Sequence, residues 1–235
     1  MNVSQASIWL LTLTLMIFLS SCAHKSFLDV RERVDFSQKR IALMQMPSDV
    51  EYTVNERTLQ KYLGSKVPKE QYTTILSANY LTELAKQIQK QVKKQKKSTV
   101  EITIFPPLDS TFIETYTKLK NLFSEQKPFQ RLAKMNYDYL ILVKTVKFNA
   151  KKNLIPVYGY KKDEGAFNER ERVIIEGEIQ VYDVKNNTLI MLGLETGISE
   201  MRILNKKGAI SSALQDVTKR TSKAIIAGRS KAMKK

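Results

Sequence analysis

The strongest constraint on the fold is the alternation of helix-like and strand-like hydrophobic patterns along the chain. Between residues 69 and 97, apolar side chains recur every three or four residues, which predicts an amphipathic helix. Residues 99–105 and 172–184 alternate apolar and polar side chains and are rich in β-branched residues, which predicts half-buried strands. Further strands are expected at residues 40–46, 137–148 and 188–194, and further helices after Asp109 or Ser110, at about 128–135 and at about 206–227.

These patterns follow one another in the order β-α-β-α-β-β-β-α. This order predicts an α/β (α+β) fold, a mixed sheet packed with helices. No internal repeat and no shift in composition divides residues 40–227, so one domain is expected there. Residues 48–66 are ambiguous, and the polar stretch 150–170, which contains Pro156, Gly159 and Gly165, is expected to be a loop.

Residues 1–21 contain no charged side chain, and an apolar run extends from Ile8 to Leu19. Its length is typical of the hydrophobic part of a signal peptide and is short for a membrane span, which needs about 20 residues. Leu19, Ser20, Ser21 and Cys22 follow, and they resemble the lipobox of bacterial lipoproteins. An uncleaved anchor and a buried helix are the alternatives, and the absence of Lys and Arg from residues 1–7 departs from the usual leader.

The lipobox resemblance implies cleavage between Ser21 and Cys22, followed by attachment of a diacylglyceryl group and an N-acyl chain to Cys22. No other cofactor is expected. Two or more acyl chains give stable membrane anchoring, whereas one chain is marginal. Ala23 stands where such lipoproteins carry the aspartate that retains them in the inner membrane, so the periplasmic leaflet of the outer membrane is expected. Residues 22–39 are expected to be a short lipidated tether, and residues 228–235 a basic tail.

The chain has 39 Lys and Arg against 23 Asp and Glu, a formal net charge of +16. Such a charge by itself suggests nucleic acid, phosphate or an anionic membrane as the partner. Because the leader contains none of these charges, they all belong to the exported part, and an exported lipoprotein does not meet cytoplasmic nucleic acid. A single cysteine also excludes an intramolecular disulfide framework and a four-cysteine zinc site.

Three further segments support a family resemblance. Residues 138–143 are expected to be a strand that directly follows a helix. Residues 181–190 are expected to form a hairpin in which Leu189 and Ile190 follow Asp183, and the last helix is expected to end at residues 225–227. With the lipobox, they resemble periplasmic lipoproteins that share an anticodon-binding-like α/β domain. These include the curli-secretion lipoprotein, the lipoprotein activators of penicillin-binding proteins and the amino-terminal domain of the Tol-system propeller protein.

Two features depart from these families. The activators have a long flexible tether, whereas only about seventeen residues are available here. The curli channel builds a barrel from hairpins with an apolar lipid-facing side, whereas Glu176 and Glu178 fall on the outer face of the hairpin expected at residues 172–194.

Candidate catalytic groups are few. His24, the only histidine, lies in the expected tether, where a base would have no fixed geometry. Glu176, Glu178, Asp183 and Glu195 offer carboxylates for a glycosidase pair, but a solvated sheet face explains the first two better. No metal site is expected, and the chain is expected not to be an enzyme.

Basic runs are the remaining feature. They occur at residues 90–97, 151–152, 161–162, 206–207 and 219–223, and in the basic tail. Solvated surface explains most of them, and the alternative is contact with lipid phosphates, cell-wall carboxylates or an acidic partner. The candidate contacts with an anionic surface are Lys93, Lys94, Lys96, Lys97, Lys161, Lys162, Lys234 and Lys235.

Together these features predict a lipid-anchored envelope protein that binds a protein partner or an anionic envelope polymer and takes part in assembly. An oligomer is compatible with this role. The alternatives are a subunit of an oligomeric secretion pore, similar to the curli channel, and a cell-wall-modifying enzyme.

Overall fold

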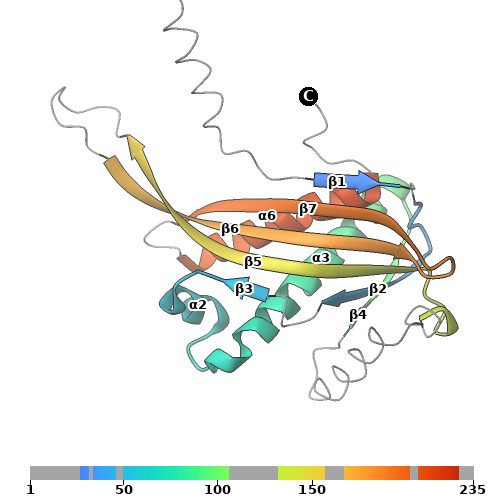
Figure 1. The fold of residues 1–235 in the computed structure, drawn as a ribbon, viewed down its shortest axis with the longest axis horizontal. Coiled ribbons are helices and arrows are strands. Elements are labelled where there is room, and N and C mark those ends of the chain that lie inside the picture. Colours follow the sequence, from blue (N-terminus) through green and yellow to red (C-terminus); the bar gives the residue numbers. More distant parts are fainter. Residues whose placement is uncertain are drawn as a thin grey trace, which may run out of the picture.

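A seven-stranded mixed sheet forms the centre of the molecule (Figure 1). The computed structural model describes residues 27–31, 34–45, 50–105, 132–156, 167–201 and 206–227. The strands are β1 (Phe27–Val30), β2 (Arg40–Gln45), β3 (Val50–Tyr52), β4 (Glu101–Phe105), β5 (Tyr139–Pro156), β6 (Phe167–Asp183) and β7 (Thr188–Met201). They lie in the order β1-β7-β6-β5-β2-β4, and β3 pairs with a further part of β5.

Both strand directions occur in this sheet. Strand β2 is parallel to its two neighbours, so that Ile41 is aligned with Ile102 of β4 and with Tyr139 of β5. Strands β5, β6 and β7 form an antiparallel meander, and β1 adds antiparallel to β7. The expected mixed sheet of an α/β domain is therefore confirmed.

The two long helices cover one face of the sheet (Figure 1). Helix α3 (Tyr72–Lys96) packs against β2, β3 and β4, whereas α6 (Lys206–Ala227) packs against β6, β7 and α3. The helices predicted at residues 69–97 and 206–227 are thus confirmed. The helix expected after residue 110 lies outside the described residues, and the one at 128–135 is described only as helical residues 132–134.

Short elements occupy residues 50–71, a range that includes most of the ambiguous segment 48–66. The 3-10 turn η2 (Lys69–Gln71) precedes α3, and helix α2 (Glu56–Leu63) packs against α6. Asn55 caps α2, since its side chain accepts a hydrogen bond from the backbone N–H of Thr58 at 2.9 Å. The helix ends at Gly64, whose φ of 112° lies in a region that favours glycine.

The main core lies between the sheet and the two long helices. The stripe predicted for α3 is buried at Tyr72, Leu76, Tyr80, Leu84, Ile88 and Val92. From the sheet, every second residue points to the same side, including Ile41 and Leu43 of β2 and Ile141 of β5. The intervening residues of these strands form a second, smaller cluster with Leu132 and Tyr137 on the opposite face.

The β6–β7 hairpin follows the predicted alternation. Val173, Ile175, Ile179 and Val181 are buried in the main core, and Glu176 and Glu178 lie on the other face. The turn is stabilised by Asp183, whose carboxylate accepts hydrogen bonds from the backbone N–H of Asn186 at 2.8 Å and from its side-chain amide at 3.0 Å. The hairpin expected at residues 181–190 is confirmed.

Two expectations are wrong. Residues 22–39 were expected to be a tether, but residues 27–30 form β1, which forms backbone hydrogen bonds with the edge of β7. The local sequence contains no pattern that predicts this pairing. The expected loop at residues 150–170 is instead the paired arms of β5 and β6 as far as Pro156 and from Phe167. There each strand satisfies the backbone groups of the other, so polar side chains do not prevent the strands from continuing (Figure 1).

Two glycines permit the close approach of the helices to the sheet. A Cβ atom at Gly197 of β7 would overlap the carbonyl oxygen of Ala213 in α6 and would lie 2.5 Å from the backbone nitrogen of Val217. A Cβ atom at Gly177 of β6 would overlap the hydroxyl of Tyr80 in α3 and would lie 2.9 Å from its Cζ atom. The distance of each helix from the sheet therefore depends on the glycine below it, Gly177 for α3 and Gly197 for α6.

Candidate anion-binding groove

A groove runs along the outer side of the contact between α3 and α6. On α3 it is lined by residues at helical spacing, beginning with Ile75 and ending with Lys94, and on α6 it is lined from Ser211 to Lys223. The low-numbered ends of both linings occur together, so the two helices run in the same direction (Figure 1). At 1.5 Å per residue, the α3 side of the groove is about 28 Å long.

The carboxyl-terminal half of the groove is cationic. It encloses about 510 Å³ and is lined by Gln87, Lys90, Gln91, Lys94, Gln215, Asp216, Lys219 and Lys223. The four lysines form one pair on each helix, Lys90 with Lys94 and Lys219 with Lys223, and the members of each pair are four positions apart. This spacing places their Cβ atoms about 6 Å apart on one helix face.

The positive charge of this half is only partly balanced by the protein. Among the residues that the structure describes, Lys90, Lys94 and Lys219 have no carboxylate within 4.0 Å. Asp216 is the acidic residue of this lining, and Arg220 donates to both of its oxygens at 3.0 Å. Because like charges four residues apart on a helix destabilise it, an anion in the groove would relieve repulsion on both helices.

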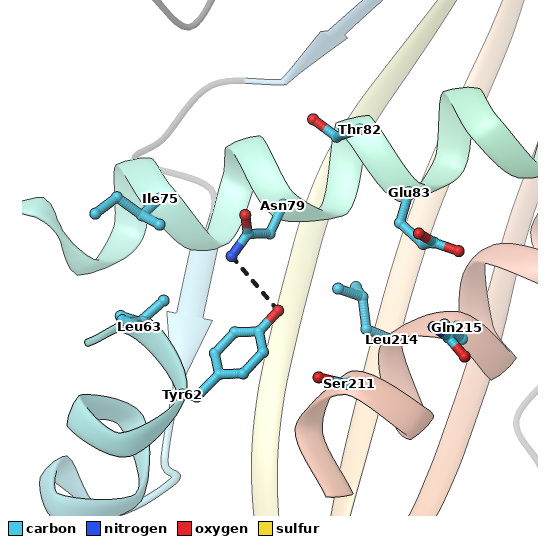
Figure 2. Close-up of a pocket in the computed structure, with 9 residues that line it drawn as sticks. All are labelled: Tyr62, Leu63, Ile75, Asn79, Thr82, Glu83, Ser211, Leu214 and Gln215. Atoms are coloured by element: carbon cyan, nitrogen blue, oxygen red, sulfur yellow. Dashed lines mark hydrogen bonds between the residues drawn. The ribbon is translucent and has the colours of Figure 1, made fainter. Parts of the chain in front are cut away.

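The amino-terminal half of the groove is polar and contains no lysine or arginine. It encloses about 370 Å³ and is lined by Tyr62, Leu63, Ile75, Asn79, Thr82, Glu83, Ser211, Leu214 and Gln215. In Figure 2 the ring of Tyr62 reaches from α2 between α3 and α6, and Asn79 donates a hydrogen bond to its hydroxyl at 3.4 Å. Burial raises the pKa of Tyr62, the Asn79 hydrogen bond opposes this rise and the charge of Glu83 adds to it, so the hydroxyl is protonated at neutral pH.

The two halves meet at Gln215, which lines both. Next to this junction, the carboxylate of Glu83 interacts with two side chains of its own helix, α3. Gln87 donates a hydrogen bond to it at 2.7 Å, and the ammonium of Lys86 lies 3.8 Å from it. A single extended molecule is therefore able to contact the hydrogen-bonding half, which Glu83 also lines, and the cationic half at once.

The structure places some of the predicted site residues and not others. Lys94 lines the groove, Lys93 is exposed outside its lining, and Lys97 ends α3 with a φ of 50°. Lys96 belongs to the last turn of α3, and its side chain is not described. The predicted residues outside the described part of the chain are Leu19, Ser20, Ser21, Cys22, Lys161, Lys162, Lys234 and Lys235.

Lys90, Lys219 and Lys223 were not singled out as site residues, although each belongs to a basic run. Their four-residue spacing within two predicted helices was the available signal, since it puts two lysines on one face of each helix. Which face each helix presents to the other is a property of tertiary packing.

The carboxylates considered for catalysis do not converge. Glu176 and Glu178 lie on the outer face of the sheet, whereas Glu195 is 3% exposed and lies on the helix side, opposite Gly177. The carboxylate of Asp183 accepts a hydrogen bond from the backbone N–H of Asn186 in the hairpin turn. Within the described ranges, no cluster of three or more His, Cys, Asp or Glu side chains is arranged to hold a metal ion.

Among the helices that the structure describes, none combines the length and the apolar character needed to cross a membrane.

Comparisons with known proteins find similarity only among solved structures. No family model and no curated protein matches the chain. The PelC dodecamer from Paraburkholderia phytofirmans is 8% identical, with a TM-score of 0.37, over 83% of this chain and 96% of that one.

Two other structures are comparable. A putative neuraminyllactose-binding hemagglutinin homolog from Helicobacter pylori is 9% identical, with a TM-score of 0.40, over 87% of this chain and 90% of that one. A minor lipoprotein from Acinetobacter baumannii is 10% identical, with a TM-score of 0.36, over 82% of this chain and 95% of that one. The particular families expected from the sequence stay a prediction.

Proposed function

We propose that this chain is a lipid-anchored, non-catalytic binding module of the bacterial cell envelope, held on the periplasmic leaflet of the outer membrane. The sequence supports the anchor through the uncharged leader and the lipobox resemblance that ends in Cys22. Ala23 supports the outer rather than the inner membrane.

Strand β1 is the structural observation that carries this proposal. Phe27 is already paired with Leu194 of β7, so only the chain from residue 22 to residue 27 separates the lipidated residue from the folded domain. Fully extended, these five peptide steps span at most about 18 Å. The domain is then confined to the membrane surface and does not reach across the periplasm.

Confinement at the surface gives the charge of the chain a role. The leader contains none of the charged side chains, so the formal net charge of +16 would lie next to the bilayer and the anionic components of the envelope. Each cation near an anionic membrane contributes about 1 kcal/mol of attraction. The α3–α6 groove provides a built surface for such a partner, whereas the carboxylates are dispersed.

Replacing the cysteine tests the anchor. Cys22→Ser is expected to abolish incorporation of radioactive palmitate and to leave the unprocessed precursor, because the serine hydroxyl does not form the thioether. Ser20→Ala is the matched control, since it keeps a small residue in the lipobox, and normal labelling and processing are expected. Palmitate labelling of the Cys22→Ser protein at the level of the unchanged chain would refute the proposal.

A further inference from the structure

We propose that the α3–α6 groove binds a phosphorylated saccharide. The phosphate occupies the cationic half, among Lys90, Lys94, Lys219 and Lys223, and the sugar occupies the half around Tyr62. This assignment goes beyond lipid anchoring and does not depend on it, because the groove lies wholly within the described domain.

The cationic half selects for phosphate by its charge density. Lys90, Lys94 and Lys219 have no carboxylate within 4.0 Å among the described residues, and a phosphomonoester supplies close to two negative charges and three acceptor oxygens. Lysine is a common phosphate ligand because its ammonium is a compact charge with three donors. Asp216 does not cancel this preference, since its carboxylate is bound by Arg220.

The neighbouring half selects for a neutral, hydroxyl-rich group. Asn79, Thr82, Ser211 and Gln215 supply hydroxyl and amide groups that both donate and accept, as sugar hydroxyls require. The protonated Tyr62 hydroxyl adds another donor and acceptor beside an aromatic ring (Figure 2). A volume of about 370 Å³ is at the lower end of the range for small-molecule sites and suits one or two sugar rings.

The arrangement of the two halves requires both parts in one molecule. They share Gln215 and follow one another along the same pair of helices. A bare phosphate fills only the cationic half, and an uncharged sugar brings no anion to Lys90, Lys94 and Lys219. A sugar phosphate satisfies both, either as a free molecule or as the headgroup of a lipid.

Binding is tested with the full chain in a non-ionic detergent, by isothermal titration with glucose 1-phosphate, inorganic phosphate and glucose. Glucose 1-phosphate is expected to bind most tightly, by at least tenfold over either fragment, and its affinity should fall as salt rises. Because these probes are soluble, the result is independent of whether Cys22 carries lipid. Equal affinity for glucose 1-phosphate and inorganic phosphate would overturn the sugar assignment.

Matched variants locate the site. Lys90→Gln/Lys219→Gln is expected to weaken glucose 1-phosphate binding by on the order of tenfold or more, because one charged donor is lost from each wall. The control Lys93→Gln/Lys144→Gln removes the same charge from exposed positions outside the groove lining and should change the affinity less than twofold. An equal loss in both variants would show a general charge effect and overturn the proposal.

A second pair of changes separates the two halves. Thr82→Ala/Ser211→Ala should weaken glucose 1-phosphate binding several-fold and leave inorganic phosphate binding unchanged, since both residues line the sugar half and neither lines the cationic half. Unchanged binding of both probes would contradict the sugar half.

Vesicles distinguish the possible sources of the ligand. If the natural ligand is a lipid headgroup, vesicles with phosphatidylinositol 4-phosphate, whose ring carries a phosphomonoester, should bind better than phosphatidylglycerol vesicles of equal total charge, and the groove lysines should be needed. If it is a free sugar phosphate, glucose 1-phosphate binds and the two vesicles are equivalent. Groove-dependent binding to both vesicle types without glucose 1-phosphate binding would make the groove a simple membrane contact and refute the proposal.

Discussion

Gly197 of β7 offers the most direct test of how the sheet holds the groove in place. In Gly197→Ala, the added methyl group would overlap the carbonyl oxygen of Ala213 and lie 2.5 Å from the nitrogen of Val217 and 2.9 Å from its Cβ atom. Ordinary contacts begin near 3.4 Å, so α6 must move away from the sheet by about 1 Å. The obstructing atoms include the helix backbone, so a change of side-chain rotamer does not relieve the contact.

The cost of this change follows from two opposing effects. Overpacking a buried position costs about 1–3 kcal/mol, and the upper part of that range applies because a whole helix is displaced. Replacing glycine by alanine also restricts the unfolded chain, which stabilises the protein by about 0.4–1 kcal/mol. The net loss in the free energy of unfolding is therefore about 2 kcal/mol, which for a domain of this size lowers Tm by about 4–8 °C.

Urea unfolding followed by circular dichroism at 222 nm measures this loss, since the only tryptophan, Trp9, lies in the expected leader and does not report on the domain. Ser212→Ala, at an exposed position of α6, is the control and should change the free energy of unfolding by less than about 0.5 kcal/mol. Gly197→Ser should cost at least as much as Gly197→Ala. A Gly197→Ala protein within 0.5 kcal/mol of the unchanged chain would refute the close approach of α6 to β7.

Two further predictions concern β1 and the amino-terminal end of β5. Leu28 is 2% exposed, so Leu28→Ala should destabilise the packing of β1 by about 2–4 kcal/mol. Amide hydrogen exchange at residues 28–30 should become faster, and an unchanged exchange rate would contradict the pairing of β1 with β7. Asp138 accepts hydrogen bonds from the Arg40 backbone N–H at 3.0 Å and from the Lys185 ammonium at 3.1 Å. Partial burial raises the pKa of Asp138, but these two donors and the charge of Lys39 outweigh burial, so the pKa lies below its ordinary value. A lowered folded-state pKa gives stability that is present above about pH 4 and lost as the pH falls through the folded pKa. In Asp138→Asn, the free energy of unfolding measured in urea should therefore fall less steeply between pH 6 and pH 2.5 than in the unchanged chain. Equal pH dependence of the free energy of unfolding in the two proteins would contradict the role of Asp138.

Local periodicity predicted the elements whose burial depends on one continuous stripe. Helices α3 and α6 were predicted close to their observed bounds, because three- and four-residue repeats require a helix to bury one face. Strands β2 and β6 followed from runs of apolar and alternating residues. The arms of β5 and β6 beyond residue 150 were missed because the sequence there has no apolar periodicity, whereas pairing between the two backbones becomes visible only in the fold.

Strand β1 shows the same limit at the other end of the chain. Its four residues are too few for a periodic pattern, and its partner in β7 lies more than 160 residues away. The sequence therefore predicted a tether where the structure has a strand, and the short distance between the anchor and the domain became visible only in the fold.

The sequence by itself determined the expected lipid anchor at Cys22, because recognition of a leader depends on a short contiguous segment and not on a fold. It also determined the fold class and the separate basic runs at residues 90–97 and 219–223. Only the tertiary structure decided that lysines of both runs line one groove, because α3 and α6 run in the same direction on one face of the sheet, about 130 residues apart in the chain. Charge is a property of each residue, whereas a binding site is a property of the packing that brings those charges together.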